Sequence, residues 1–494
     1  MTARHRPDHL ALIDPDETLT YADLLERMHG SAQALLDAGL QRDEPVCFAM
    51  TPSADYVVKI LGCLLAGGVA APVNTRLTPT EACAYIARLE PGLVVSDPEH
   101  TATVGGADDD GAQPEPRVVM SGPDQPSTRE GMSVEALLSE LAEDAPAIIF
   151  PTGGTTGLPK GAYTDHRGLH LWTWNIAQGS RRHRNEVELY FSPFFHVSLM
   201  VGMMAPLFAG GTVVIEPTFD VDRTIDAIRK HQVTRLMGAP TMFAAIGARR
   251  DTDRDALEMI RDIICGAAAS TEEFTTQLLK DFPNAQIGTG YGATEFASGV
   301  SRVEDADLRR GRLDGVGLPN VGCEIRIVDD EGEPVEPGEV GHILVRSPWQ
   351  TLGYWKQPEE TAATYRDDGF IDLGDLGRFD ETGWLYISGR SKEMILSGGE
   401  NVFPIEVENA INAEPGVVEV VAFGVPDDHW GERVEAVVTA AEGAVLDPEA
   451  LRNSVRDRLA GYKIPKRIHV VDSIPLTPNN KPDRRALVSR YSTQ

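Results

Sequence analysis

The stretch Phe150–Tyr163, FPTGGTTGLPKGAY, follows the apolar run Ala147–Phe150, and together they predict a strand that runs into a loop. Glycines in such a loop let the backbone approach an anion closely, and hydroxyl and ammonium groups offer donors to it. The residues concerned are Thr152, Gly153, Gly154, Thr155, Thr156, Gly157 and Lys160. The loop is not of the GxxxxGK[ST] type, because Lys160 lies between Pro159 and Gly161. It suits the outer phosphates of a nucleotide, although a Gly/Thr loop alone also serves as an ordinary turn.

On both sides of this loop, helical and strand patterns alternate. Residues 18–42 carry apolar side chains at helical spacing after a short strand-like TLTY, and VCFAM and VAAPV flank a predicted helix at Ser53–Ala66. This alternation indicates a largely parallel sheet covered by helices. It recurs farther along the chain, at Thr212–Ile215, Val221–His231, Arg235–Met237, Pro240–Ala248 and Ile263–Cys265. Residues 101–133 lack periodicity and are expected to form a solvated loop or insertion.

From about residue 321 the pattern changes to short strands with tight turns, which favours antiparallel hairpins. After Arg390, residues 390–494 predict a separate small α+β domain with its boundary at Gly389–Lys392. The expected fold is therefore α/β and multidomain. A large N-terminal domain of helix-covered sheets, residues 1–389, includes a β-rich subdomain at about 321–389. A small, mobile α+β domain follows.

The composition limits the class of partner. Among 494 residues, 75 Asp and Glu outnumber 45 Lys and Arg, and the formal net charge of -30 disfavours nucleic acid. The cysteines are widely spaced without a CxxC pair, so neither a disulfide framework nor a zinc site is expected, and a reducing cytoplasm fits best. The N-terminal residues do not read as a signal peptide. The apolar stretch Val197–Ile215 is interrupted by Pro206 and glycines, which favours a buried helix, a Gly-Gly turn and a buried strand over a membrane span.

Four further motifs follow the loop in order. They are YGATE at 291–295, LGDLGRFDETGWLYISGR at 373–390, SKEMILSGGENVFPIEVE at 391–408, and PLTPNNKPDRRAL at 475–487. With the loop, they make five ordered signatures that resemble those of the adenylate-forming superfamily, which includes acyl-CoA synthetases, peptide-synthetase adenylation domains and luciferases. The chain departs from the usual family pattern at three positions: Gly153 replaces a Ser, Leu373 a Thr and Asn480 a Gly.

The resemblance implies roles for the residues of the second and third motifs. Gly290, Tyr291 and Gly292 would receive adenine, with Tyr291 stacking on it, and Thr294 would donate to the α-phosphate. Glu295 would hold Mg²⁺, since a carboxylate suits a hard cation. Asp375 would accept both ribose hydroxyls, and Arg390 would reach the ribose and phosphate.

The resemblance also implies two half-reactions that use the C-terminal domain differently. Lys481 would bridge the carboxylate and the α-phosphate during adenylation. The domain would then rotate about a hinge at Lys392, and Gly398 and Gly399 would line a channel for a thiol. His196 would lie near the carboxylate, in an acyl pocket lined by Phe195–Met203, Gly266–Ser270 and Gly288–Gly290.

The implied enzyme activates a carboxylic acid with ATP and Mg²⁺ as an acyl-adenylate, releases pyrophosphate, and transfers the acyl group to coenzyme A. The expected pocket walls are mostly apolar, which favours an aliphatic or aromatic monocarboxylate. These segments contain no Lys or Arg that could bind a second carboxylate, so a dicarboxylate is disfavoured. Transfer to a carrier-protein phosphopantetheine or another nucleophile stays open, as does a homodimer. A nucleotide-binding regulator without catalysis is the other alternative. It is disfavoured because Glu295, Asp375, Arg390 and Lys481 are all present.

Overall fold

The structure is a computed structural model, and it describes residues 2–104, 117–120, 133–152, 158–179, 182–266, 271–297, 299–427, 429–441, 443–477 and 481–492. The chain forms two compact units. The first consists of Met1–Leu313, Gly317–Glu324 and Arg346–Gly369, and the second of Asp314–Val316, Ile325–Val345 and Phe370–Gln494. This division groups the hairpin strands after residue 324 with the C-terminal segment. The expected boundary at Gly389–Lys392 stays a prediction.

The first unit contains a seven-stranded sheet in the order β18-β8-β7-β4-β3-β5-β6. Its strands from β7 to β6 run parallel, and β8 and β18 pair antiparallel at one edge. Their bounds are Gly353–Tyr354, Lys160–Asp165, Pro146–Thr152, Val69–Pro72, Pro45–Ala49, Leu93–Ser96 and Arg117–Met120. The prediction of a loop throughout 101–133 was wrong for Arg117–Met120, because this apolar run pairs with β5. It was also wrong for Thr101–Val104, which forms helix α5.

A second seven-stranded sheet of this unit has the order β13-β12-β11-β9-β10-β1-β2. All its pairs are parallel except β1 with β2. The bounds are Gln286–Gly288, Asp262–Cys265, Arg235–Gly238, Val187–Tyr190, Thr212–Ile215, Leu10–Ile13 and Thr18–Thr20. A short pair, β14 (Ser301–Arg302) and β15 (Leu318–Pro319), follows the sheet in the chain.

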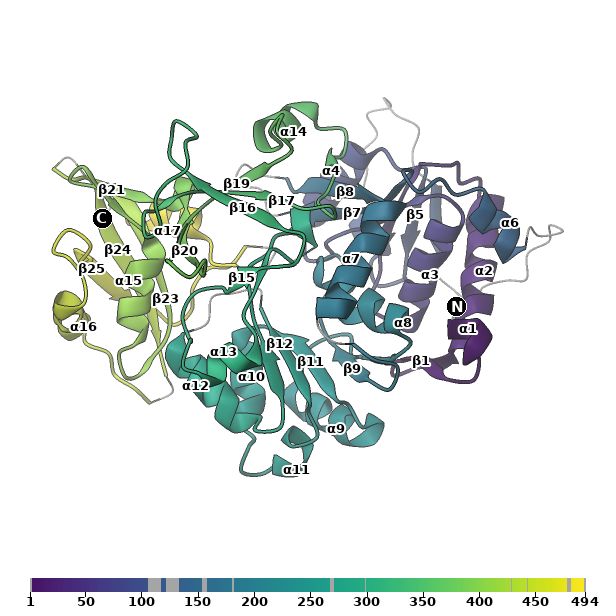
Figure 1. Ribbon diagram of the computed structural model, residues 1–494, viewed down its shortest axis with the longest axis horizontal. Helices are drawn as coiled ribbons and strands as arrows, with labels where there is room; N and C mark the ends of the chain where they lie inside the picture. The colour runs from purple at the N-terminus through teal and green to yellow at the C-terminus, as the bar shows by residue number, and fades with distance from the viewer. Residues whose placement is uncertain are drawn as a thin grey trace. The chain divides into compact units, whose positions relative to one another are not determined.

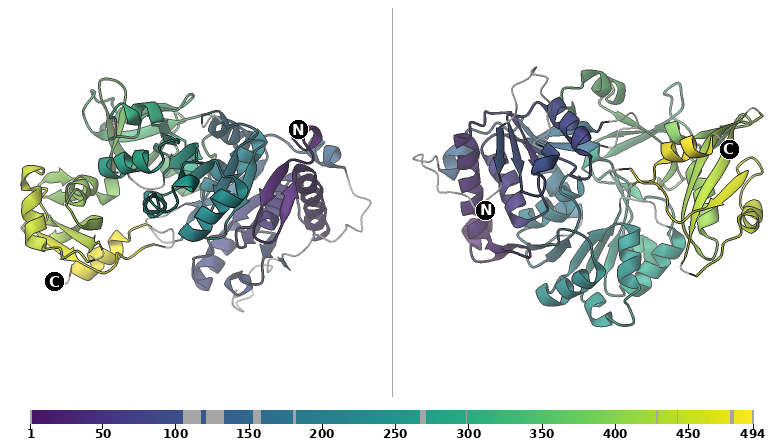
Figure 2. Two further views of the ribbon diagram at one scale, coloured as in Figure 1. Left: turned by 90° about the horizontal axis from the view of Figure 1, so that it is seen from below. Right: turned by 180° about the vertical axis from the view of Figure 1, so that it is seen from behind.

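The helices of the first unit cover these sheets. They are α1 Thr2–His5, α2 Tyr21–Asp37, α3 Ala54–Leu65, α4 Pro79–Leu89, α5, α6 Val134–Ser139, α7 His166–Gly179, α8 Ala205–Ala209, α9 Val221–His231, α10 Pro240–Gly247, α11 Arg254–Leu257, α12 Glu272–Asp281, α13 Asp305–Arg309 and α14 Pro358–Thr364. Helices α2 and α3 lie side by side (Figures 1 and 2). One continuous apolar cluster joins them to α7 and to both sheets, while α4 packs on a separate cluster behind β3, β4 and β5.

Helix starts in this unit follow local chemistry. Thr20 and Thr78 cap α2 and α4 through reciprocal bonds with Asp23 and Glu81, and Ser53 caps α3 by accepting from the Tyr56 amide. These side chains satisfy amides that the first helical turn leaves unpaired. Because the pattern is local, the sequence could place these starts.

The second unit contains two further sheets. The four-stranded antiparallel sheet has the order β16-β17-β19-β20, with bounds Glu324–Val328, Gly341–Arg346, Ile371–Phe379 and Leu385–Arg390. The C-terminal sheet contains β21 Ile395–Ser397, β22 Glu400–Val402, β23 Val417–Asp427, β24 Gly431–Ala440 and β25 Arg467–Val470. Its helices are α15 Pro404–Asn412, α16 Pro448–Ser454 and α17 Arg484–Tyr491. A 3₁₀ turn at Val455–Asp457 follows helix α16 directly.

The fold class expected from the sequence is confirmed: the chain is α/β, with helix-covered sheets followed by hairpins and a small α+β segment. The Val197–Ile215 stretch is also a helix, a Gly-Gly turn and strand β10, but its first turn, Met200–Met204, is a π-helix. Within the described part of the chain, no helix combines the length and the apolar character that crossing a membrane requires.

Candidate active site

The phosphate-loop motif joins β7 and β8 at the edge of the first sheet. Thr152 ends β7, Lys160 begins β8, and the two residues pair directly across the hairpin. Thr152 is buried and Lys160 is half-buried. Gly153, Gly154, Thr155, Thr156 and Gly157 lie outside the described residues. The structure therefore fixes both ends of the loop, and the roles of its members stay predictions.

Lys160 and Glu295, which belong to two different motifs, both contact one tyrosine, Tyr354. The Tyr354 hydroxyl donates to Glu295 Oε1 at 2.7 Å, and Lys160 Nζ lies 4.5 Å from the centre of the Tyr354 ring. Glu295 is buried, with 6% of its surface exposed. The folded first unit thus brings together the two charged groups that the motifs assign to the phosphates and to Mg²⁺.

Sequence reasoning missed Tyr354. It lies in TLGYWKQPEET, a stretch expected to belong to the hairpin region, yet the two-residue strand β18 pairs with β8. Burial raises the pKa of Tyr354, and the neighbouring Glu295 carboxylate raises it further, so the hydroxyl keeps its proton and acts as a donor. The only sequence signal for a site residue here was the aromatic pair Tyr354-Trp355 directly after Gly353. Aromatic pairs are common in hairpin strands, so this signal does not single out a functional residue.

A second contact holds the backbone of Glu295. The Thr351 amide donates to the Glu295 carbonyl at 2.8 Å, and the Thr351 hydroxyl bonds with Tyr365. Tyr365 in turn meets Tyr354 edge-on, with ring centres 5.8 Å apart. Glu295 is therefore held at both its side chain and its main chain by the segment Thr351–Tyr365.

The other residues of YGATE form an irregular turn after β13. Gly290 is exposed, and a side chain there would meet the Ser301 backbone, because an added Cβ would lie 2.2 Å from the Ser301 carbonyl oxygen. The Tyr291 carbonyl accepts hydrogen bonds from the Val300 and Ser301 amides. Gly292 is exposed, and Thr294 is half-buried and begins a 3₁₀ turn that carries Glu295. Their nucleotide-binding roles stay predictions.

His196 lies in the loop after β9. Its Nδ1 accepts from the Ser198 amide at 3.1 Å, and the ring is half-buried. The apolar residues that follow, Met200 and Met203, are fully buried. Gly266 is described, while 267–270 of the expected acyl-pocket wall lie outside the described residues. The placement of His196 near a carboxylate stays a prediction.

In the second unit, the structure brings Asp375 and Arg390 together. They are register partners on β19 and β20, and Arg390 Nε lies 3.0 Å from Asp375 Oδ1. Asp375 is 5% exposed, whereas 41% of the Arg390 side chain is exposed. A buried carboxylate fixed by an arginine can still present its acceptors to a diol. Lys392, which is exposed, follows in a 3₁₀ turn.

Gly398 and Gly399 form the turn between β21 and β22. Both have positive φ, +65° and +85°, which is the conformation of a two-residue turn of type I′. The Gly398 amide donates to the Trp430 carbonyl at 2.7 Å, and a Cβ on Gly398 would lie 3.0 Å from the Trp430 ring. The turn needs glycine for its backbone, whatever its part in thiol transfer.

Lys481 lies in the C-terminal part of the second unit, directly before Pro482. Its carbonyl accepts from the Thr477 amide at 2.7 Å, and Leu476 and Pro482 pair in an antiparallel bridge. The residue is exposed, so it lies at the surface of the unit. Its role in adenylation stays a prediction.

The residues around Glu295 fit a magnesium ion. Among the described residues, no three His, Cys, Asp or Glu side chains gather to hold a metal. Mg²⁺ does not require such a cluster, because it is commonly held by one or two carboxylates together with substrate phosphates and water. A buried carboxylate oriented by Tyr354, whose ring also contacts the lysine at the start of β8, meets that need.

Comparison with known proteins supports the same reading. A family model described as AMP-binding enzyme matches residues 1–355, and one described as AMP-binding enzyme C-terminal domain matches residues 406–481. A feruloyl-CoA synthase from Amycolatopsis sp is 33% identical over 97% of this chain and 95% of the relative. An indoleacetate–CoA ligase from Aromatoleum aromaticum is 32% identical over 98% of this chain and 96% of the relative.

Among solved structures, o-succinylbenzoate CoA synthetase from Bacillus subtilis, in complex with ATP and magnesium ion, matches with a TM-score of 0.84. The two are 26% identical, and the match covers 98% of each chain. The family models and the relatives cover nearly the whole chain, and the signatures occur in the expected order. The chain therefore belongs to the AMP-binding enzyme family, and it is an AMP-forming ligase of the acyl-CoA synthetase type.

Proposed function

We propose that this enzyme activates an apolar aliphatic or aromatic monocarboxylate with Mg²⁺ and ATP, and transfers the acyl group to coenzyme A. The observation that carries the proposal is the group Lys160–Tyr354–Glu295, which sets a cation and a buried carboxylate beside the phosphate-loop hairpin. Such a pair suits a nucleotide triphosphate with its metal. The same site would also serve an enzyme that loads a carrier protein.

The adenylation step would use residues from several of the five motifs. Lys160 would neutralise the outer phosphates, Glu295 would hold Mg²⁺, and Lys481 would place its ammonium between the carboxylate and the α-phosphate. When bound, the metal supplies positive charge to phosphate oxygens that would otherwise repel the carboxylate. Asp375 would accept the ribose hydroxyls. Pyrophosphate is the leaving group.

The substrate class rests on the walls expected to line the acyl pocket. Met200 and Met203 are completely buried and Met204 nearly so, and thioether side chains adapt to irregular apolar ligands. The two relatives named for feruloyl-CoA and indoleacetate favour an aromatic acid. One cation, Arg76, lies near the expected pocket wall although it belongs to none of the expected segments. Its guanidinium carbon is 5.9 Å from the centre of the Phe195 ring. A dicarboxylate therefore belongs in the test.

The test is a carboxylate panel scored by pyrophosphate release. It should include ferulate, indoleacetate, fatty acids of rising length and a dicarboxylate, each with CoA and with a phosphopantetheinylated carrier protein. We expect an aromatic or aliphatic monocarboxylate to give the highest rate, with thioester formed on CoA. AMP release only with the carrier protein would overturn the choice of CoA, and no release with any acid would overturn the proposal.

Lys481→Ala separates the half-reactions. We expect adenylation to fall by roughly 10²–10³, the usual effect of removing a group that stabilises charge in the transition state. Conversion of supplied acyl-adenylate to thioester should persist. Equal loss in both half-reactions would contradict the use of Lys481 in adenylation alone.

A further inference from the structure

The π-helix Met200–Met204 of the first unit runs directly into α8. Its ladder is closed by the Ala205 amide, which donates to the Met200 carbonyl five residues earlier. The next residue in that ladder is Pro206, which has no amide hydrogen. The ladder therefore cannot continue to the Val201 carbonyl, and a buried carbonyl needs a donor from elsewhere.

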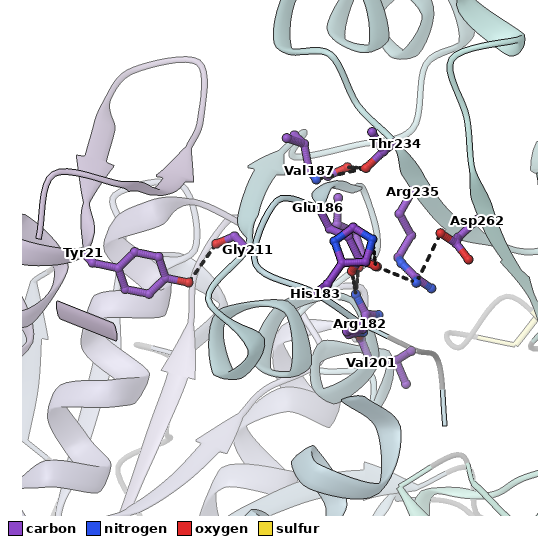
Figure 3. A network of polar contacts seen from close by, with 11 residues as sticks. Tyr21, Arg182, His183, Glu186, Val187, Val201, Gly211, Thr234, Arg235 and Asp262 are labelled. Carbon is purple, nitrogen blue, oxygen red and sulfur yellow. Dashed lines mark hydrogen bonds and ion pairs between the residues drawn. The ribbon is translucent and has the colours of Figure 1, made fainter. Parts of the chain in front are cut away.

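Arg182 supplies that donor. Its Nη2 donates to the Val201 carbonyl at 2.6 Å, and its side chain is completely buried. Figure 3 shows Arg182 between Glu186 and Val201. A guanidinium rarely lies fully inside a protein unless it is paired, so its position is determined by its partners.

Those partners are carboxylates at the start of β9. Arg182 pairs with Glu188, whose side chain is also completely buried, and lies 3.9 Å from Glu186. Glu186 also binds Arg235, at 3.1 Å, and Arg235 reaches Asp262 on β12 (Figure 3). The ion pair with Glu188 anchors Arg182 to strand β9, and Arg182 anchors the π-helix to that strand.

The π-helix fits tightly against the far end of the same strands. A Cβ on Gly202 would lie 2.3 Å from the Tyr190 ring and 2.9 Å from the Met237 methyl group. The Tyr190 hydroxyl is within hydrogen-bonding distance of the Ser198 hydroxyl, at 3.1 Å, two residues after His196. A shift of the π-helix by a fraction of an ångström would therefore move Tyr190, Met237 or the loop that carries His196.

We propose that Arg182 is a positioning residue that holds the π-helix Met200–Met204 in one register and thereby sets which carboxylates the enzyme accepts. The inference rests on the proposed function, because it takes these residues as the wall of the acyl pocket. Glu188 acts through Arg182 by fixing the guanidinium. Pro206 makes the arrangement necessary, since it removes the backbone donor that a continuous π-helix would supply to the Val201 carbonyl.

The experiment compares four variants by two measurements, and the fourth adds Pro206→Ala to the first. Arg182→Met/Glu188→Met replaces the pair with apolar side chains of similar length, which avoids leaving one buried charge alone. Arg182→Lys keeps the charge but loses the fork that bonds two partners at once. Arg235→Met is the matched control, because it breaks a buried pair of the same network at Glu186 and Asp262. Hydrogen exchange is measured on 199–209, and kcat/KM on two carboxylates of different size.

In Arg182→Met/Glu188→Met and Arg182→Lys, we expect faster exchange at Met203–Ala209, and at least a tenfold change in the ratio of kcat/KM between the two carboxylates. The KM for ATP should stay within about twofold. Arg235→Met should leave the exchange of this segment and the ratio unchanged. Adding Pro206→Ala to Arg182→Met/Glu188→Met should restore both, because it returns a backbone donor.

Two results would overturn the inference: wild-type exchange at Met203–Ala209 without Arg182, or faster exchange with an unaltered substrate ratio. Should the double variant fail to fold, Arg182→Lys decides by the same measurements. Failure of the proposed function is a separate outcome, recognised when wild-type enzyme releases no pyrophosphate with any acid. The inference falls with it, even if exchange shows that Arg182 holds the π-helix.

Discussion

Replacing Tyr354 with Phe removes one hydrogen bond and leaves the ring. The hydroxyl donates at 2.7 Å to a carboxylate that is 6% exposed, so the bond is charge-assisted and shielded from water. A hydrogen bond to a charged group contributes about 1.5–3 kcal/mol. The ring that faces Lys160 at 4.5 Å is retained in Tyr354→Phe, so the cation–π contact survives.

The free energy lost with this hydrogen bond lowers both the stability of the fold and the affinity for Mg²⁺. Glu295 would lose the donor that orients it and would have to reorganise to meet Mg²⁺. Since about 1.4 kcal/mol is tenfold, the full effect corresponds to roughly 10- to 100-fold in the apparent affinity for Mg²⁺ and ATP. We expect at least a tenfold rise in the Mg²⁺ concentration that gives half-maximal pyrophosphate release. Thioester formation from supplied acyl-adenylate should change by less than about threefold.

The assay titrates Mg²⁺ at saturating ATP, and it measures thermal stabilisation by Mg²⁺ and ATP as a readout independent of turnover. Tyr365→Phe is the matched control, because its hydroxyl bonds with Thr351 and so lies one residue farther from the carboxylate. Tyr354→Leu additionally removes the ring, and its extra loss measures the contact with Lys160, worth about 0.5–2 kcal/mol. Unchanged Mg²⁺ dependence and unchanged stabilisation in Tyr354→Phe would refute the reasoning.

Two further predictions concern the Gly398–Gly399 turn between β21 and β22 and stability in acid. Gly398→Ala and Gly399→Ala should each cost about 1–2 kcal/mol, because both positions have positive φ, but only Gly398 faces Trp430. We expect Gly398→Ala to slow thioester formation more than Gly399→Ala does, with adenylation unchanged in both. Each half-reaction is assayed separately, and equal effects of the two variants on thioester formation would contradict a role of Gly398 in the thiol channel. Burial raises the pKa of Asp97, but bonds from the Thr51 amide and His100 outweigh it, so the pKa lies below the usual range. The stability from these bonds is therefore present above the unfolded pKa of about 4 and is lost as pH falls through the lower native value. In Asp97→Asn, the free energy of unfolding, measured with urea between pH 6 and 3, should fall less steeply as the pH is lowered. An unchanged pH dependence would show that Asp97 is not its source.

Much of the fold was predictable because helices and parallel strands carry local patterns. The expected helix Val221–His231 has the same bounds as α9, and strand Thr212–Ile215 the same as β10. The ends of α10 and β12 differ by one residue from those expected. Apolar spacing and capping residues lie within a few positions of each other, so the sequence shows them directly.

The candidate site was predictable in part, for the same reason. Thr152 and Lys160 end up as partners in one hairpin, and Asp375 and Arg390 as partners in another. Each pair is close in sequence and belongs to a recognisable motif. What could not be predicted was the link between motifs, because Tyr354 reaches Glu295 across 59 positions and lies in a strand of two residues.

The sequence by itself determined the alternation of elements, the order of the five signatures and hence the family. Only the tertiary structure decided that Tyr354 joins Lys160 to Glu295, and that Arg182 reaches the Val201 carbonyl behind Pro206. The physical reason is that periodicity and turn chemistry act over a few residues. A hydrogen bond between buried groups that are distant in the sequence depends on how the whole intervening chain folds, so no local pattern predicts it.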